Sequence, residues 1–201
     1  MTLARLLAAA FLAAALPVAA LPPAAQAADA ARGATLAAQN CANCHGANGR
    51  SQVPGVPSLA GQPADFITVQ MILLREGIRQ APAMNPFAQG VPDRDIEDLA
   101  AFFASLPPGP PDDRAPRDEA LFAAGQALTG PRHCATCHVS DYGGRAQIPR
   151  VAAQREEYLV HAMTEYRDGS RAGVDTQMNS AVIGLSNAHI AALAHFLAHL
   201  D

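Results

Sequence analysis

Apolar residues recur along this chain at the three-to-four-residue spacing of amphipathic helices, and no segment shows the sustained alternation of a strand. The spacing predicts helices over residues 30–44, 64–76 and 93–105, and a further helix that begins at Ser186, a favourable N-cap residue. Gly77 lies where the second of these helices should end, as a C-terminal glycine often does. The pattern therefore predicts an all-α fold.

The two halves of the chain repeat one another. The segment CANCH at residues 41–45 matches CATCH at residues 134–138, an offset of 93 residues. Further matches occur at offsets of 92 to 94 residues, and they pair Pro57 with Pro149, Gln62 with Gln154, Phe66 with Tyr158, Arg75 with Arg167, Gly77 with Gly169, Arg79 with Arg171, Met84 with Met178 and Phe102 with Phe196. An offset this steady indicates a duplicated domain.

A proline-rich segment separates the two halves. Residues 106–113 (LPPGPPDD) favour extended backbone and cannot continue a helix, which is typical of a semi-rigid linker. We therefore expect a first domain over residues 28–106, a linker over residues 107–116 and a second domain over residues 117–201.

Residues 1–27 have the anatomy of a secretory signal peptide. Arg5 supplies a positive start, an apolar run follows, and AQA at residues 25–27 is a small-x-small cleavage site with cleavage after Ala27. An uncleaved membrane anchor is the less favoured interpretation, because the apolar run ends at Leu16, short of the ~20 residues that span a bilayer. The sequence thus predicts a soluble protein that is exported to the periplasm.

Composition and charge narrow the functional classes. The chain of 201 residues is 50% hydrophobic and 16% charged, which is too apolar and too weakly charged for a disordered protein. It contains no lysine and has a formal net charge of −4, so it lacks the basic surface that binding to nucleic acid requires. Four cysteines are too few for a disulfide-stabilised scaffold of this length, so their spacing has to be interpreted instead.

The two Cys-x-x-Cys-His motifs point to covalent haem. In an exported protein this motif is typical of c-type haem attachment, in which two thiols on one helical turn bond to one porphyrin and the next residue ligates its iron. The attachment residues would be Cys41 and Cys44 in the first half and Cys134 and Cys137 in the second. His45 and His138 would be the proximal ligands. The sequence therefore predicts two covalently bound haem c groups.

Other uses of paired cysteines fit this chain less well. A structural zinc site places two Cys pairs about 15–20 residues apart, whereas Cys44 and Cys134 are 90 residues apart. A thioredoxin-like redox pair would need a βαβ unit, which the pattern does not predict. Haem would also supply the apolar core that a domain of about 80 residues with few aromatic residues lacks.

The sixth iron ligand decides between an electron carrier and a catalyst, because an open site would bind small molecules. Met71 and Met163 fall on the apolar face of a predicted helix, where methionine usually fills a core. Met84 and Met178 fall in irregular segments 39 and 40 residues after their histidines, and a loop there can reach the far face of the haem. We therefore favour Met84 and Met178 as the axial ligands.

The remaining histidines and four arginines give weaker signals. We expect structural roles, at the surface or partly buried, for His133, His161, His189, His195 and His199. Two interpretations fit the four repeated arginines equally well: they pair with haem propionates, or they lie at solvated helix ends. These residues are Arg75, Arg79, Arg167 and Arg171.

The order of these features resembles class I cytochrome c domains: a helix, Cys-x-x-Cys-His, a proline loop, a central helix, a methionine loop and a C-terminal helix. Two such domains in tandem, with PSLAGQ at residues 57–62, resemble the bacterial dihaem cytochrome c4 family over essentially the whole chain after residue 27. The resemblance implies two tandem class I cytochrome c domains, each wrapped around one covalently bound haem and related by a pseudo-twofold axis. It also implies that Pro57 and Pro149 offer carbonyls to the proximal histidines, and that Gly33 and Gly125 let the first helix of each domain pack on the last.

By the same resemblance, the chain is an electron carrier rather than an enzyme. It would take single electrons from a quinol-oxidising bc complex or a dehydrogenase and pass them towards a terminal oxidase. It would do so free in the periplasm or attached to the membrane surface, through a weak and transient interface at the haem edge. Two alternatives stay open: the dihaem subunit of a flavocytochrome sulfide dehydrogenase or another periplasmic dehydrogenase, and a dihaem peroxidase, in which one iron keeps an exchangeable site.

Overall fold

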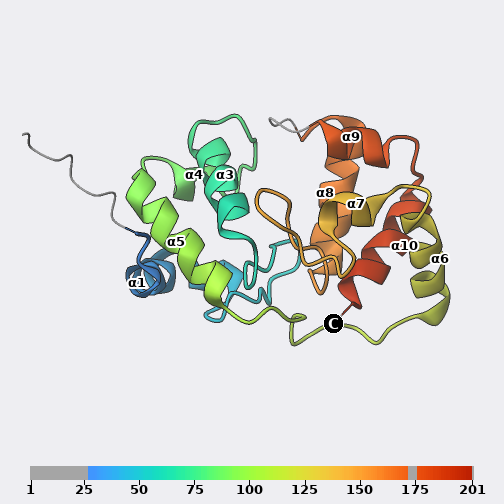
Figure 1. Ribbon diagram of the computed structural model, residues 1–201, viewed down its shortest axis with the longest axis horizontal. Coiled ribbons are helices and arrows are strands. Elements are labelled where there is room, and N and C mark those ends of the chain that lie inside the picture. The colour runs from blue at the N-terminus through green and yellow to red at the C-terminus, as the bar shows by residue number, and fades with distance from the viewer. Residues whose placement is uncertain (1–26, 172–175, 201) are drawn as a thin grey trace, which may run out of the picture.

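The computed structural model describes residues 27–171 and 176–200, so the predicted signal peptide, apart from Ala27, lies outside the described residues. Two helical lobes lie side by side, and the linker runs along their lower edge (Figure 1). The first lobe contains α1 (Ala30–Asn40), α2 (Ala42–His45), α3 (Ala64–Arg75), α4 (Asn85–Ala88) and α5 (Asp93–Ser105). The second contains α6 (Glu119–Thr129), α7 (Cys134–His138), α8 (Glu156–Asp168), α9 (Gln177–Val182) and α10 (Asn187–Ala198).

The described ranges contain only helices and irregular segments, apart from an isolated bridge between Arg145 and Ile148. The all-α prediction is therefore confirmed. The cap expected at Ser186 is also present, because its side chain accepts a hydrogen bond from the backbone N–H of His189 at the start of α10.

The structure departs from the predicted helices in two places. The helix expected over residues 30–44 breaks at Cys41, which ends α1 with φ −117° and caps α2. The methionine segments, expected to be irregular, contain α4 and α9, so that Met84 is the N-cap of α4 and Met178 lies in the first turn of α9. Pro86 favours a helix in the first of these segments because its ring presets a helical φ.

In each lobe the first helix packs closely against the last, α1 on α5 and α6 on α10. A β-carbon on Gly33 would overlap the backbone of Asp98 and come within 2.9 Å of Phe102 Cβ. A β-carbon on Gly125 would overlap the α10 backbone and come within 2.6 Å of Phe196 Cβ. Helices at this separation therefore leave room only for glycine at the two crossings, as expected.

Each lobe has an apolar core of its own. In the first lobe the buried core residues are Ala37, Ile67, Leu99, Ala100 and Phe103, and Cys41 and Met71 pack against them. In the second lobe a larger core, built mainly on α8 and α10, has Cys134 and Met178 packed against it. Within the described ranges, no helix combines the length and the apolar character that crossing a membrane requires.

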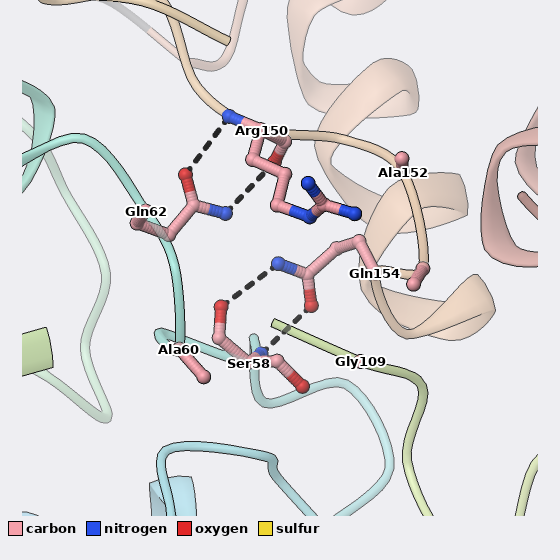
Figure 2. A pocket seen from close by; sticks show the side chains of 8 residues that line it. Ser58, Ala60, Gln62, Gly109, Arg150, Ala152 and Gln154 are labelled. Carbon is pink, nitrogen blue, oxygen red and sulfur yellow. Dashed lines mark hydrogen bonds between the residues drawn. The ribbon is translucent and has the colours of Figure 1, made fainter. Parts of the chain in front are cut away.

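The lobes also contact one another directly. Gln62 in the first lobe and Gln154 in the second each bind backbone atoms of the opposite lobe (Figure 2). The buried guanidinium of Arg155 donates to the carbonyl of Ser51 in the first lobe at 2.9 Å and to both carboxylate oxygens of Asp113 in the linker at 2.8 and 3.0 Å. The lobes are therefore held together by direct hydrogen bonds as well as by the linker.

Candidate haem-binding sites

Each Cys-x-x-Cys-His motif folds as one short helix. In the first lobe the carbonyl of Cys41 accepts a hydrogen bond from the N–H of His45 at 2.9 Å, which closes a single helical turn over the motif. In the second lobe α7 follows His133, whose left-handed backbone (φ 54°) makes the sharp entry into the helix. All four cysteines are free thiols. One turn therefore gathers two thiols and an imidazole, the set that covalent haem attachment uses.

The thiols do not have the properties of a reactive redox pair. Burial raises the pKa of the Cys41 and Cys134 thiols, which disfavours the thiolate that attacks a disulfide. The group of side chains in the described part of the chain that could hold a metal ion, Glu156, His195 and His199, contains no cysteine. Both observations favour haem over the alternatives weighed for these cysteines.

The two histidines are held in the form that can bind iron. His45 Nδ1 lies 2.9 Å from the carbonyl oxygen of Pro57, and His138 Nδ1 lies 2.9 Å from that of Pro149. A carbonyl only accepts hydrogen bonds, so Nδ1 carries the proton and Nε2 keeps its lone pair for a metal. Burial lowers the pKa of His45, against the opposing effect of its bond to Pro57, and this favours the neutral ring. The residues present therefore fit haem.

A serine pair anchors the loop that carries Pro57. The hydroxyl of Ser51, which is fully buried, donates to the carbonyl of Cys44 at 3.0 Å, and the backbone N–H of Ser51 donates to the hydroxyl of Ser58 at 3.1 Å. These bonds tie the proline loop to the haem motif. Neither serine could be singled out for this role from the sequence, because hydroxyl groups of this kind are common in loops.

The favoured methionines are each followed by an asparagine that anchors the segment. Asn85 Nδ2 donates to the carbonyl of Leu74 at 2.8 Å, and Asn179 Nδ2 donates to the carbonyl of Tyr166 at 2.6 Å. Leu74 and Tyr166 occupy equivalent positions near the ends of α3 and α8. Each methionine therefore lies next to a hydrogen bond that fixes its segment to the central helix. The sequence feature that could have revealed this anchor is the Met-Asn pair, which is present in both halves.

The other methionine pair lies where core residues lie. Met163 on α8 is 7% exposed and belongs to the core of the second lobe, and Met71 on α3 packs against the core of the first. Met178 is partly buried and packs against the edge of the second core. The assignment of Met84 and Met178 as axial ligands stays a prediction.

Arg75 and Arg167 join the central helix of each lobe to the last. Arg75 Nη1 donates to the Val91 carbonyl at 2.9 Å and to Asp93 at 2.6 Å, just before and at the start of α5. Arg167 Nη1 makes the equivalent pair of bonds, to the carbonyl of Leu185 and to the Asn187 side chain. These two guanidinium groups therefore have structural partners, which disfavours haem propionates as their main ligands.

Arg79 and Arg171 lie instead on either side of one tyrosine. Arg171 Nη1 is 3.4 Å from the Tyr158 hydroxyl, and Arg79 of the first lobe also bonds to this hydroxyl. Burial acts to raise the pKa of Tyr158, but the positive charges of Arg171 and Arg79 outweigh it and hold the pKa below its usual value. Two cations from the two lobes thus converge on one point, which leaves them as candidates for carboxylate partners.

Two buried histidines, His195 in the last turn of α10 and its C-cap residue His199, hold the linker. His195 Nδ1 donates to Glu156 at 3.0 Å and its Nε2 accepts from the backbone N–H of Asp118 at 2.8 Å, while His199 Nε2 lies 3.0 Å from the Ala115 carbonyl. They are 5% and 8% exposed, more buried than surface or partly buried residues would be. A metal ion bound to Glu156, His195 and His199 would have to displace these bonds, so we assign the cluster a structural role.

Comparisons with known proteins agree with this geometry. Residues 28–103 match the family described as cytochrome c oxidase, cbb3-type, subunit III, and residues 122–201 match the cytochrome c family. Cytochrome c4 of Pseudomonas aeruginosa is 35% identical over 178 residues, which cover 85% of this chain and 88% of that protein. A Stutzerimonas stutzeri protein named thiosulfate dehydrogenase electron acceptor is 31% identical over 192 residues, which cover 88% of each chain.

The fold is also that of a solved relative. The crystal structure of reduced recombinant cytochrome c4 from Pseudomonas stutzeri superposes with a TM-score of 0.77 at 30% sequence identity. The match covers 87% of this chain and 100% of that one.

Proposed function

The chain belongs to the dihaem cytochrome c4 family, and from this premise we propose a periplasmic protein that passes single electrons between respiratory-chain partners through two His/Met-ligated haems. Its two cytochrome c domains, its two covalently bound haem c groups and its general role as an electron carrier follow from the family. The ligand set, the compartment and the partners are the parts that we propose.

The observation that carries the proposal is the repeated histidine geometry. In both lobes the histidine of the motif is buried to 8% exposure and its Nδ1 is bound to a proline carbonyl, so each lobe presents an oriented Nε2. When bound, haem supplies a one-electron couple. Cys41 and Cys44 would hold it in the first lobe, and Cys134 and Cys137 in the second.

The methionines would complete the ligand set. A sulfur ligand from Met84 or Met178 opposite the histidine would close the sixth position, which leaves no site for a substrate and favours the reduced state. The asparagine bonds fix these segments to the central helices, which would hold the sulfur atoms in place. A closed, rigid site of this kind suits electron transfer and does not suit peroxidase chemistry.

The ligand assignment can be tested with optical spectra. Met84→Ala and Met178→Ala should each convert one of the two haems from a low-spin six-coordinate form to one that binds carbon monoxide. The matched controls, Met71→Leu and Met163→Leu, change core methionines and should leave both haems low-spin and closed. A carbon monoxide complex in the controls but not in the alanine variants would reverse the assignment.

The partners define two candidate roles. A carrier towards a terminal oxidase is the role that the family resemblance implies. The relative named thiosulfate dehydrogenase electron acceptor favours a role as acceptor of a periplasmic dehydrogenase. Stopped-flow reduction of the oxidised protein by a quinol-oxidising bc complex and by a thiosulfate dehydrogenase would separate the two. The faster donor under equal conditions identifies the role.

The periplasmic location rests on the leader. We expect the protein purified from a periplasmic fraction to begin at Ala28, and N-terminal sequencing would check this. A mature chain that retains residues 1–27 would favour attachment to the membrane instead.

A further inference from the structure

The peptide group that orients each histidine also contacts the opposite lobe. In the first lobe the peptide between Pro57 and Ser58 accepts from His45 Nδ1 through its carbonyl at 2.9 Å, and its N–H donates to Gln154 Oε1 at 2.7 Å. Gln154 belongs to the second lobe, 96 residues further along the chain. One planar group therefore joins a haem-binding histidine to a glutamine of the other lobe.

The second lobe makes the equivalent arrangement. The peptide between Pro149 and Arg150 accepts from His138 Nδ1 at 2.9 Å, and its N–H donates to Gln62 Oε1 of the first lobe at 3.0 Å. Gln62 and Gln154 are equivalent residues of the repeat, as are Ser58 and Arg150, at an offset of 92. The two connections therefore obey the pseudo-twofold relation between the lobes.

Each glutamine is fixed in place by further bonds, and Gln154 Oε1 also accepts from the backbone N–H of Arg155 at 2.9 Å. Gln154 Nε2 donates to the carbonyl of Ser58 at 2.9 Å, and Gln62 Nε2 donates to the carbonyl of Arg150 at 2.8 Å (Figure 2). Gln62 is 4% exposed and Gln154 is 5% exposed, so water screens these bonds little. The side-chain amide of each glutamine therefore makes two hydrogen bonds to the backbone of one residue in the opposite lobe. It donates to the carbonyl of that residue and accepts from its N–H, so the amide oxygen is held in position to accept.

We propose that Gln154 and Gln62 are positioning residues that tune the haem of the opposite lobe, through the peptide that binds its histidine. A peptide is conjugated, so a hydrogen bond accepted from its N–H increases the negative charge on its carbonyl oxygen. That oxygen then attracts the Nδ1 proton of the histidine more strongly, makes the ring a stronger donor to the iron and favours the oxidised state. The inference rests on the proposed role of His45 and His138 as iron ligands.

The test compares two variants at equivalent positions of the repeat. Gln154→Met removes the acceptor for Ser58 N–H and should raise the reduction potential of the haem in the first lobe, while Gln62→Met should raise that of the haem in the second. At the wild-type midpoint potential, we expect the oxidised-to-reduced ratio of the affected haem to fall by roughly two- to tenfold. The effect should be smaller than the ~10–100-fold loss of metal affinity or activity that follows removal of a group bonded directly to a metal ligand, because one more bond intervenes. Gln154→Glu, which keeps an acceptor oxygen, should not raise it.

The measurement is a redox titration of each holoprotein in which NMR signals of the two haems are followed separately. A shift confined to the opposite-lobe haem in both variants supports the proposal. Equal shifts of both haems in each variant would indicate loosened lobes and would overturn it, as would no shift in either. The optical spectrum of the same samples checks the histidine ligation independently, so loss of low-spin haem in the wild type would count against the proposed function rather than against this inference.

A measurement on the reduced wild type covers the case in which a variant does not fold. A through-hydrogen-bond scalar coupling should join the Ser58 nitrogen to the side-chain carbonyl carbon of Gln154, and another should join Arg150 to Gln62. If both couplings are absent, the glutamines do not accept from these peptides and the proposal fails.

Discussion

Replacing Gly125 by alanine tests the packing on which the second lobe depends. Gly125 lies in the middle of α6, and a β-carbon there would overlap the backbone of Ala192 and stand 2.6 Å from Phe196 Cβ. Both obstacles belong to the α10 main chain or are attached to it, so no side-chain rotation can relieve the overlap. The matched control is Gly130→Ala, because Gly130 has φ −63° and open space around it.

The size of the effect follows from two opposing terms. Carbon atoms pack at about 3.5–4.0 Å, so α6 and α10 must separate by about 1 Å, and an overlap with backbone as severe as this one costs about 2–3 kcal/mol, the upper end of the usual cost of overpacking. Alanine recovers about 0.8–1 kcal/mol of helix propensity relative to glycine. The free energy of unfolding of the second lobe should therefore fall by about 1–2 kcal/mol, equivalent to roughly 4–16 °C in its Tm. Gly130→Ala should leave it unchanged or raise it by up to about 1 kcal/mol.

Denaturant unfolding of the holoprotein, followed by haem absorbance and by far-ultraviolet circular dichroism, would measure both variants. A Gly125→Ala protein within about 0.5 kcal/mol of the wild type would show that α6 and α10 are not packed as described. Equal destabilisation by Gly130→Ala, which has open space around it, would show that the loss is not specific to the helix crossing.

Two further predictions concern the first lobe and the methionine segments. A hydrogen bond from the backbone N–H of Asp29, and then the bond and charge of Arg32, hold the pKa of buried Asp98 below its ordinary range. Because the pKa is lower in the folded state than in the unfolded state, the ionised carboxylate stabilises the fold. This stabilisation is complete above the unfolded pKa near 4 and is lost as the pH falls through the folded pKa. The unfolding midpoint of the first lobe should thus drop on acidification, and Asp98→Asn should flatten that dependence; an unchanged pH profile would contradict the assignment. Asn85→Ala and Asn179→Ala remove bonds worth about 1 kcal/mol each and should make the neighbouring haem bind carbon monoxide without loss of haem; spectra identical to the wild type would show that the methionine segments do not need these anchors.

The features that sequence reasoning found are those set by local spacing. The Cys-x-x-Cys-His motifs and the 92-to-94-residue offsets identify two haem domains, and the apolar spacing locates α3, α5 and α10 to within a residue or two. Gly33 and Gly125 were found because the resemblance places them at helix crossings, and the structure shows why no larger residue fits. The motifs, the offsets and the helices follow from residue type and spacing alone, whereas the two glycines follow from the family resemblance.

Most of the features that sequence reasoning missed depend on contacts between segments far apart in the chain. Gln62 and Gln154 were visible as a repeated pair, but their partners lie 88 and 96 residues away in the other lobe, at distances that no periodicity reports. The burial of His195 and His199 likewise depends on the path of the linker past α10. The break at Cys41 was missed because a helical pattern continues through it, although the backbone does not.

The most direct test of two electron-carrying haems in one chain is an optical redox titration of the exported protein after removal of any pigment that acid-acetone extracts. We expect the extracted polypeptide to keep its colour and to take up two electrons in two one-electron steps, with low-spin spectra in both oxidation states. A single one-electron step, or colour that leaves with the solvent, would contradict the presence of a covalently bound, redox-active haem in each lobe.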